Sequence, residues 1–172
     1  MHAPISSLKE PQLLPDVALT SSEGHTVRTS DYRGRCNLVL VFVGRSIRDE
    51  VRPLLGGCAE EYRAFDEWTA EVLAVLQGTP QDAARVKRRE ALPFPVLADA
   101  DGRGHRAFRA VMPSGEAAAA VYIADRWGEI YLACRTRAGQ ALPTPQAILE
   151  WLHFIAIQCP ECGVADWPRL ED

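Results

Sequence analysis

Two cysteines near the carboxyl end form the clearest chemical motif of the sequence. Cys159 and Cys162 stand in the run Cys-Pro-Glu-Cys-Gly, so two residues separate the sulfur-bearing positions. This spacing allows a short disulfide or two thiolate ligands to one metal ion, and the proline and glycine favour a tight turn. A structural zinc ion needs four ligands, which a second chain or His153 would have to complete. Redox use, a zinc knuckle and a structural pair that caps a helix are three open interpretations.

Cys58 is a second candidate for a reactive thiol. It follows Gly56-Gly57 and opens a run in which aromatic residues recur at helical spacing. A cysteine at a helix N-terminus has a lowered pKa, because backbone N–H groups and the helix dipole stabilise its thiolate. In the alternative, which we favour, the helix begins near Asp49 and Cys58 packs in its second or third turn. Pro53 suits that alternative, since proline is tolerated in a first helical turn.

The remaining cysteines and histidines carry weaker signals. Cys36 and Cys134 adjoin apolar, strand-like runs, and we expect both to be small packing residues. His2, His25 and His105 have no partner nearby in the sequence, so we expect them to be exposed to solvent.

The composition limits the classes of protein that fit. The chain has 172 residues, of which 47% are hydrophobic and 24% charged, as is typical of one globular domain. Its net charge of −4 argues against a general nucleic-acid binder, and the basic run 87–89 indicates only a solvated helix face. The longest apolar stretch, 38–43, is far too short to span a membrane. With no visible signal peptide and an odd number of cysteines, we expect a cytoplasmic protein.

The order of predicted elements indicates a single α/β domain. We expect an irregular arm over 1–13, a domain over 14–158 and a tail over 159–172. Strands and helices alternate through the middle of the domain, which favours a parallel core, and two hairpins add antiparallel strands. The expected strands are 17–20, 26–28, 37–43, 71–76, 94–97, 117–124 and 129–134, and the expected helices are 58–70, 79–90, 104–111 and 143–158.

Four stretches resemble the redoxins, the thioredoxin-fold group that includes the peroxiredoxins of the alkyl hydroperoxide reductase and thiol-specific antioxidant family. Their order and spacing carry the resemblance over most of the chain. It implies a thioredoxin-like three-layer sandwich, with a central mixed sheet, an N-terminal β-hairpin and flanking helices. The stretches are Leu-Pro-Asp-Val-Ala-Leu at 14–19, Asp-Tyr-Arg-Gly at 31–34 before the strand 38–42, Glu-Val-Leu-Ala-Val at 71–75, and Phe-Pro-Val-Leu-Ala-Asp at 94–99 before Asp-Gly at 101–102.

The resemblance implies a thiol-dependent antioxidant or a disulfide oxidoreductase. Such a protein would act on a peroxide or a disulfide substrate and would be regenerated by a reducing thiol protein, with no cofactor. Cys58, Cys159 and Cys162 are the candidate catalytic residues, and zinc enters only if the tail pair forms a knuckle. Homodimers are common in this family, so we expect one here.

The sequence departs from the family at three places where the family has functional residues. The reactive cysteine that follows the central strand would align with Val51, and the first cysteine of a Cys-x-x-Cys with Arg48. The arginine that holds the peroxide would align with Ala119, and the nearest equivalent of the cis-proline is Pro113, several residues too early. The alternative function is therefore a non-catalytic, degenerate redoxin that acts by binding a partner or by dimerising.

Overall fold

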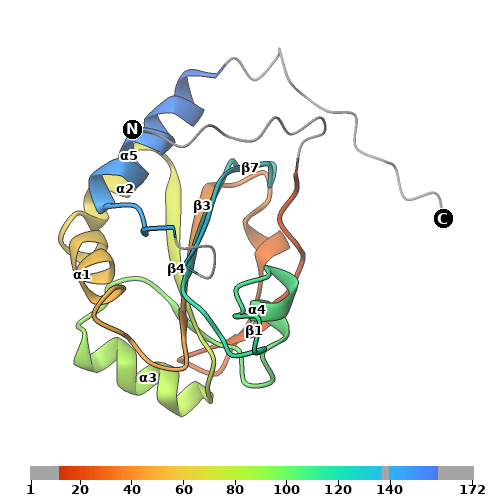
Figure 1. The fold of residues 1–172 in the computed structure, drawn as a ribbon. Coiled ribbons are helices and arrows are strands. Elements are labelled where there is room, and N and C mark those ends of the chain that lie inside the picture. The colour runs from red at the N-terminus through yellow and green to blue at the C-terminus, as the bar shows by residue number, and fades with distance from the viewer. Residues whose placement is uncertain (1–11, 137–139, 159–172) are drawn as a thin grey trace, which may run out of the picture.

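A seven-stranded mixed sheet is the centre of the fold. The computed structural model describes residues 12–136 and 140–158, and within them the strand order is β2-β1-β5-β4-β3-β6-β7 (Figure 1). β3, β4 and β5 are parallel, and the remaining pairings are antiparallel. The strands are β1 (Ala18–Ser21), β2 (Thr26–Arg28), β3 (Asn37–Gly44), β4 (Ala70–Leu76), β5 (Val96–Ala98), β6 (Ala120–Ala124) and β7 (Ile130–Arg135).

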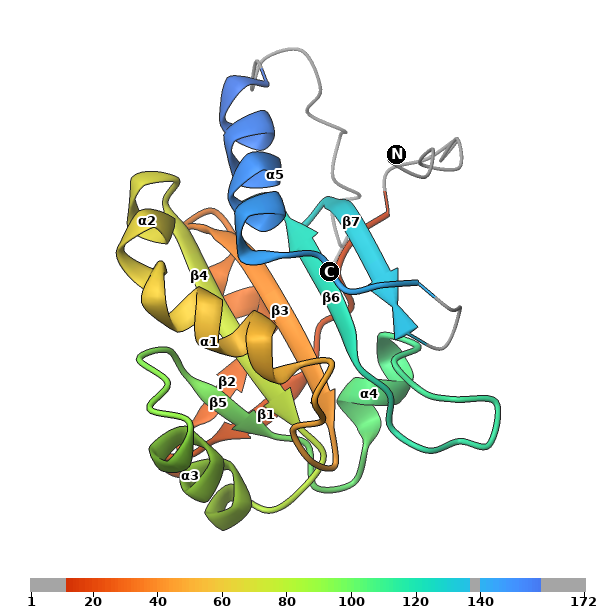
Figure 2. The ribbon, with the colours of Figure 1, turned by 60° about the vertical axis from the view of Figure 1, so that its left-hand side comes forward.

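Helices cover both faces of the sheet, which confirms the predicted thioredoxin-like three-layer architecture. α1, α2 and α5 lie on one face, and α4 lies on the other (Figures 1 and 2). None of the helices in the described ranges has the length and apolar character needed to cross a bilayer. The helices are α1 (Arg52–Glu60), α2 (Tyr62–Glu67), α3 (Pro80–Arg89), α4 (Arg103–Ala107) and α5 (Pro145–Ile157), with a 3₁₀ turn η1 (Thr29–Tyr32).

Strand β3 joins the two layers of the core. All eight of its residues are buried, as its continuous apolar run predicts. Successive side chains of a strand point to opposite faces, so Val39 and Val41 pack under α1 and α5, whereas Leu40 and Phe42 pack toward α4. Phe42 lies in a group of rings that includes Phe108 and Tyr122. β3 therefore fixes where the segment that follows it leaves the sheet.

Local capping rules account for the starts of α3 and α5. Thr79 accepts a hydrogen bond from the backbone of Asp82, whose side chain bonds back to Thr79, and Pro80 occupies the first turn. Thr144 and Pro145 repeat the threonine-proline start. Both helix starts were predicted from these residue pairs, and the structure confirms them.

The helical region after β3 differs from its prediction. One helix was expected, either over 58–70 or, in the favoured alternative, from about Asp49; α1 begins at Arg52, and a break at Glu61 separates it from α2. The break lets Tyr62 donate a hydrogen bond to Glu71 of β4 at 2.8 Å. α1 also packs closely on the start of α5, so a Cβ on Gly57 would clash with the ring of Pro145.

Gln12 and Leu13, the first described residues, contact the segment that leads into β7. Gln12 accepts a hydrogen bond from Ile130 at 2.7 Å, and Leu13 bridges to Glu129 beside β7. The contacts therefore begin inside the predicted arm. The rest of the arm and the tail 159–172 lie outside the described residues.

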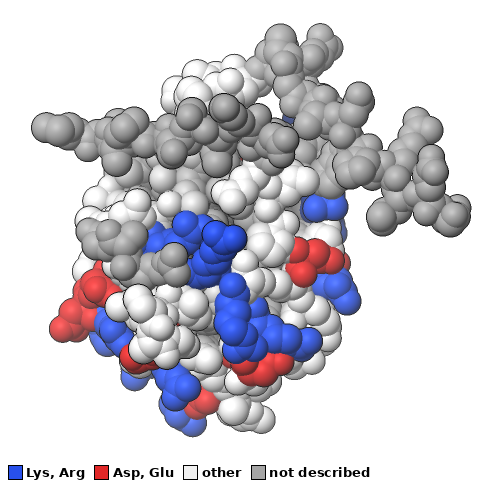
Figure 3. Space-filling view, turned by 45° about the vertical axis from the view of Figure 1, so that its right-hand side comes forward, with Lys and Arg blue, Asp and Glu red and all other residues white. Residues whose placement is uncertain are grey.

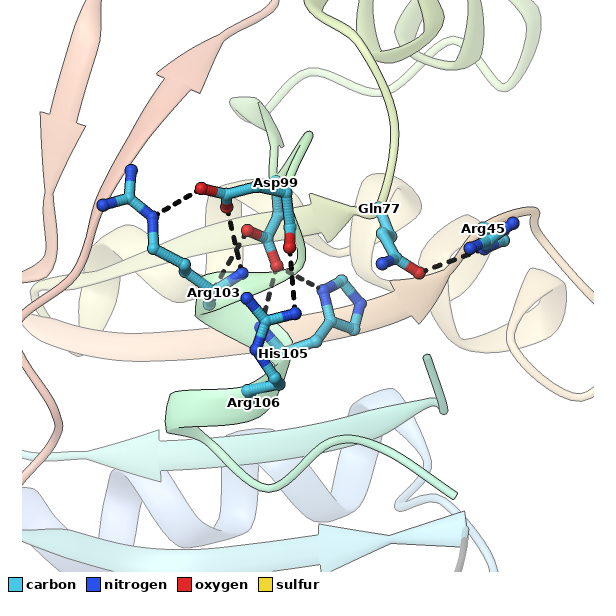
Figure 4. A network of polar contacts seen from close by, with 8 residues as sticks. Arg45, Gln77, Asp99, Arg103, His105 and Arg106 are labelled. Carbon is cyan, nitrogen blue, oxygen red and sulfur yellow. Dashed lines mark hydrogen bonds and ion pairs between the residues drawn. The ribbon is translucent and has the colours of Figure 1, made fainter. Parts of the chain in front are cut away.

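A buried Asp99–His105 pair anchors α4 to the end of β5 (Figure 4). Both side chains are fully buried, so the prediction that His105 is exposed was wrong. His105 donates from Nδ1 to Asp99 at 2.7 Å, since an ionised carboxylate can only accept, and its ring packs edge-on against Phe42. Asp99 also accepts from the backbone N–H groups of Gly104 and His105. The residues near His105 in the sequence could not reveal its burial, because Phe42, the ring that packs against it, comes from β3.

We predict that Phe42→Ala strongly destabilises the protein. It removes a fully buried ring that contacts the rings of His105, Phe108 and Tyr122, and core Phe→Ala changes cost about 3–5 kcal/mol. Denaturant unfolding would measure the loss. Phe154→Ala is the matched control, because Phe154 is 45% exposed and its truncation should cost less than about 1 kcal/mol. Equal losses in the two variants would contradict the central role of β3.

We predict that the free energy of unfolding of Asp99→Asn depends less on pH in the acid range than that of the wild type. Burial alone raises the pKa of Asp99, but the hydrogen bonds from His105 and Gly104 outweigh it and hold the pKa below its ordinary value. A depressed folded-state pKa stabilises the fold above about pH 4, and this stabilisation is lost as the pH falls through that pKa.

The measurement is the free energy of unfolding as a function of pH. On acidification, the free energy of unfolding of Asp99→Asn should fall less than that of the wild type. At neutral pH it should be about 1–3 kcal/mol lower than the wild-type value, because one buried donor loses its acceptor. Asp49→Asn, which removes an exposed carboxylate, should follow the wild-type curve. Parallel curves for Asp99→Asn and the wild type would show that the carboxylate is not stabilised by folding.

Candidate functional site

The segment between β3 and α1 is where the resembled family has its reactive thiol. The carbonyl of Arg48 accepts hydrogen bonds from the backbone N–H groups of Val51 and Arg52 at 3.0 and 3.1 Å. The first helical turn therefore starts just after Arg48, close to the start that the favoured alternative gives at Asp49. It contains no sulfur atom. The dipole of α1 would favour a thiolate at this helix start, but no cysteine lies there.

The residues that occupy this position pack and pair instead of reacting. Val51 is completely buried and belongs to the core beneath α1. Arg48 forms an ion pair with Glu116 at 3.1 Å, which joins this loop to the loop before β6. More than half of each side chain is exposed, so solvent screens the pair and it contributes little to stability.

The other two family positions also lack functional side chains. Ala119 is buried, and its carbonyl accepts hydrogen bonds from the backbone and side chain of Thr136. Pro113 lies in an exposed turn that is closed by hydrogen bonds between Met112 and Glu116 and between Gly115 and Met112. Neither Ala119 nor Pro113 therefore provides a positively charged side chain near α1, or a backbone segment that could face a substrate there.

Cys58 lies in the second turn of α1 and is completely buried. The interpretation that placed it at the helix start does not match this position, and the alternative, a packing residue, does. Burial raises the pKa of its thiol to about 12, so very little thiolate forms at neutral pH. Its surroundings are apolar core residues on the α1 face of the sheet.

Cys36 and Cys134 are also unsuited to nucleophilic attack. Cys36 is partly buried before β3, and burial together with the charge of Glu71 raises the pKa of its thiol. Cys134 is buried in β7 and donates a hydrogen bond to the carbonyl of Ala141 at 2.9 Å. Burial raises the pKa of Cys134 as well. Cys134 is thus the core residue predicted from the sequence, and Cys36 lies at the edge of the core, where it lines a shallow surface pocket.

A metal centre is not formed within residues 12–136 and 140–158, where no three potential ligands come together. His153, a candidate zinc ligand, is exposed and stacks against Trp68 with ring centroids 4.9 Å apart. Cys159 and Cys162 lie outside the described residues. The zinc interpretation therefore depends on these two cysteines.

The surface charges do not form a single basic area on the face that includes α4. Lys and Arg side chains are interspersed with Asp and Glu over this face (Figure 3). On α3, Lys87 pairs with Glu23 at 3.6 Å and Arg89 pairs with Glu90 at 2.9 Å. The run 87–89 is a solvated helix face, as predicted.

A polar cluster at the carboxyl ends of β3, β4 and β5 was not predicted from the sequence. Arg45, Gln77 and Asp99 each follow one of the parallel strands, and α4 adds His105 and Arg106 (Figure 4). The only local signal was the Asp-x-Asp-Gly turn at 99–102, which marked a turn without indicating a buried carboxylate. Because the Asp99–His105 pair is fully enclosed, it holds α4 in place and does not face a substrate.

Comparison with known proteins identifies the family. Residues 12–133 match the AhpC/TSA family. Peroxiredoxin Bcp of Bacillus subtilis is 27% identical over 97 residues, which cover 56% of this chain and 61% of that protein. This chain therefore matches less than two thirds of the length of that relative.

Solved structures agree with this relationship at the level of the fold. The bacterioferritin comigratory protein of Xanthomonas campestris aligns with a TM-score of 0.69 and 20% identity, over 81% of this chain and 92% of that chain. The peroxidoxin BcpB of Mycobacterium tuberculosis aligns with a TM-score of 0.72 and 16% identity, over 84% and 96%. Because the family match spans most of the described domain, the chain belongs to the AhpC/TSA family of thioredoxin-fold, peroxiredoxin-like proteins.

Proposed function

We propose that this protein is a thiol-dependent redox protein whose reacting dithiol is Cys159 and Cys162 and not a cysteine at the start of α1. The burial and raised pKa of Cys58 carry the proposal, because they remove the one other candidate nucleophile. Membership of the AhpC/TSA family supports thiol redox chemistry in general. The tail pair has the spacing that lets one thiol attack and the other resolve.

The proposed reaction is an exchange of two electrons between the tail dithiol and a substrate. With a disulfide substrate, one thiolate attacks a sulfur atom, a mixed disulfide forms and the first substrate thiolate leaves. The second cysteine then attacks the mixed disulfide, which releases the second substrate thiol and leaves a Cys159–Cys162 disulfide. With a peroxide, the first thiolate attacks one oxygen and becomes a sulfenic acid, while the O–O bond breaks and the other oxygen takes up a proton and leaves as water or an alcohol. The second thiol condenses with it and releases water.

The proposal implies a partner and a compartment. The Cys159–Cys162 disulfide has to be reduced by an external dithiol, such as a reducing thiol protein, which is itself oxidised to a disulfide. Free thiols at Cys36, Cys58 and Cys134 fit a reducing compartment such as the cytoplasm. No metal or organic cofactor takes part.

A non-catalytic function is the second candidate, and the outer face of α5 favours it. Phe154 is 45% exposed and Ile157 is 67% exposed, and both lie just before the tail. Apolar exposure next to Cys159 and Cys162 suits a homodimer in which two tails together supply four thiolates to one zinc ion. In that case the tail pair is structural and no substrate is turned over.

We predict that Cys159→Ser and Cys162→Ser each lower the rate of peroxide or disulfide reduction at least tenfold. The assay would supply dithiothreitol as reductant and hydrogen peroxide or a small aromatic disulfide as substrate. Cys58→Ala is the matched control and should retain the wild-type rate, because its thiol is buried in the core.

Two outcomes would overturn this function. Loss of activity in folded Cys58→Ala, with activity retained in the tail variants, would place the chemistry on α1. An inactive wild type that is dimeric and contains one zinc ion per two chains would instead establish the non-catalytic candidate.

We also predict that Cys58 reacts slowly with thiol reagents in the native protein. With a pKa raised to about 12 by burial, its alkylation at neutral pH should be far slower than that of a free cysteine and should become fast only in denaturant. Timed alkylation followed by peptide mass spectrometry measures the rate at each cysteine. Alkylation of Cys58 at the rate of a free thiol in native conditions would contradict its placement.

A further inference from the structure

The C-terminal half of α5 extends past the edge of the sheet and exposes apolar side chains there (Figures 1 and 2). Phe154 is 45% exposed and Ile157 is 67% exposed, whereas Ile155 between them is buried against the core. A surface helix normally presents polar side chains to solvent and an apolar stripe to the core. An apolar outer face at the end of α5 therefore indicates a surface that another polypeptide segment covers.

Aromatic rings extend this surface from α5 onto β7. Phe154 lies edge-on to Trp151 with ring centroids 5.7 Å apart, and edge-on to Tyr131 of β7 with centroids 6.3 Å apart. Both of these neighbours are only partly buried. We call Tyr131, Trp151, Phe154 and Ile157 the α5 patch. Because its rings hold one another in place, a side chain that binds the patch needs little ordering of the patch itself.

The tail 159–172 begins next to this patch, because Gln158 ends α5. Within the tail, Pro160 and Gly163 favour a turn, which lets the chain reverse its direction after α5. An extended chain spans up to about 3.3 Å per residue, whereas Phe154 lies only one helical turn, about 5.4 Å, before Gln158. The segment after Gly163 is therefore long enough to return to the α5 patch.

The composition of segment 164–170 suits an apolar surface. Val164, Trp167 and Leu170 recur at every third position, and the residues between them are small, charged or proline. A segment that stays in solvent has few large apolar residues, because it has no core in which to bury them. Tryptophan is enriched where one segment binds another, since its large ring buries much apolar area. Trp167 is therefore the residue of this segment best suited to the α5 patch.

Two arguments favour the tail of the same chain over a second copy as the occupant of the patch. The tail is joined directly to α5, and short flexible connections give effective concentrations in the millimolar range. The patch is also small, because Phe154 and Ile157 are the only large apolar side chains exposed on α5 among the described residues. A stable dimer interface needs about 20–30 residues on each partner. A short peptide segment fits this area better than a folded domain does.

We propose that segment 164–170 binds the α5 patch of the same chain, with the ring of Trp167 packed between Phe154 and Ile157. The contact is stabilised by the burial of these three apolar side chains. Cys159 and Cys162 then lie in the connection between α5 and the bound segment, so the contact holds the dithiol beside the domain. The inference does not depend on the proposed redox function, because it requires no reaction of either cysteine.

The test is limited trypsin digestion of the full-length protein with all thiols kept reduced. Arg169 is the only trypsin site after residue 158, and Lys9 is the only one before residue 12, where it serves as an internal reference. A protease cleaves the open form of a segment, so binding of segment 164–170 should slow cleavage after Arg169. Ile157→Gln removes an exposed apolar side chain of the patch and should speed this cleavage about tenfold relative to cleavage after Lys9.

Met112→Gln is the matched control for the digestion. Met112 is also an exposed apolar side chain, but it lies in the loop between α4 and β6, away from α5. Cleavage after Arg169 should therefore proceed at the wild-type rate in this variant. Digestion of the wild type at tenfold lower protein concentration should give the same rate constant, because a contact within one chain does not depend on dilution.

Indole N–H signals in a ¹⁵N-labelled sample show where Trp167 lies. Trp167→Ala should shift the signal of Trp151, because it removes a ring from the patch that Trp151 shares with Phe154. The signal of Trp127 should not change, since Trp127 lies in the turn between β6 and β7 and outside the patch.

Equal cleavage rates after Arg169 in the wild type and Ile157→Gln, or equal acceleration in Met112→Gln, would overturn the proposal, as would an unchanged Trp151 signal in Trp167→Ala. A cleavage rate that increases on dilution of the wild type would also overturn it and would show that a second copy covers the patch. The thiol assays of the proposed function measure turnover and not this contact, so either proposal can fail while the other holds.

Discussion

Burial of β3 on both faces of the sheet is the constraint on which the rest of the structure depends. All eight residues of the strand are shielded from water, and their alternate side chains belong to two separate core layers. Because the strand is parallel to β4 and antiparallel to β6, its end fixes the starting point of α1 and the position of the ring cluster around Phe42. Because β3 is apolar on both faces, neither face can turn toward solvent. The central position of this strand in the sheet is therefore strongly specified.

The thioredoxin fold is present in this chain, and the segment between β3 and α1 contains no cysteine. The segment that leaves β3 turns into a helix, and the carbonyl of Arg48 accepts hydrogen bonds from the first N–H groups, those of Val51 and Arg52. In this segment, Val51 packs into the core and Arg48 forms an ion pair with Glu116. Cys58 lies further along the helix, where it is buried in the core. Packing of apolar side chains such as Val51 and Leu55 against the sheet holds α1 in place.

The parts of the fold governed by local rules could be predicted from the sequence, and the parts governed by distant contacts could not. Thr79 with Pro80 marked the start of α3 because a cap and a first-turn proline act within one turn. The burial of His105 was missed because it depends on Phe42, which comes from another strand. The early start of α1 was the favoured of two alternatives, because Pro53 suits a first helical turn, whereas Gly56 and Gly57 also fitted a start at Cys58. The departures at Val51 and Ala119 were predictable because they required only the order of the elements.

We propose above all that the thiol chemistry of this chain resides in Cys159 and Cys162 and not in Cys36, Cys58 or Cys134. The most direct test is peptide mass spectrometry of the reduced, native protein after one equivalent of hydrogen peroxide. The account predicts that the oxidised product is a disulfide between Cys159 and Cys162, with Cys36, Cys58 and Cys134 still reduced. Sulfenic or sulfinic acid on Cys58, with the tail cysteines unmodified, would contradict it.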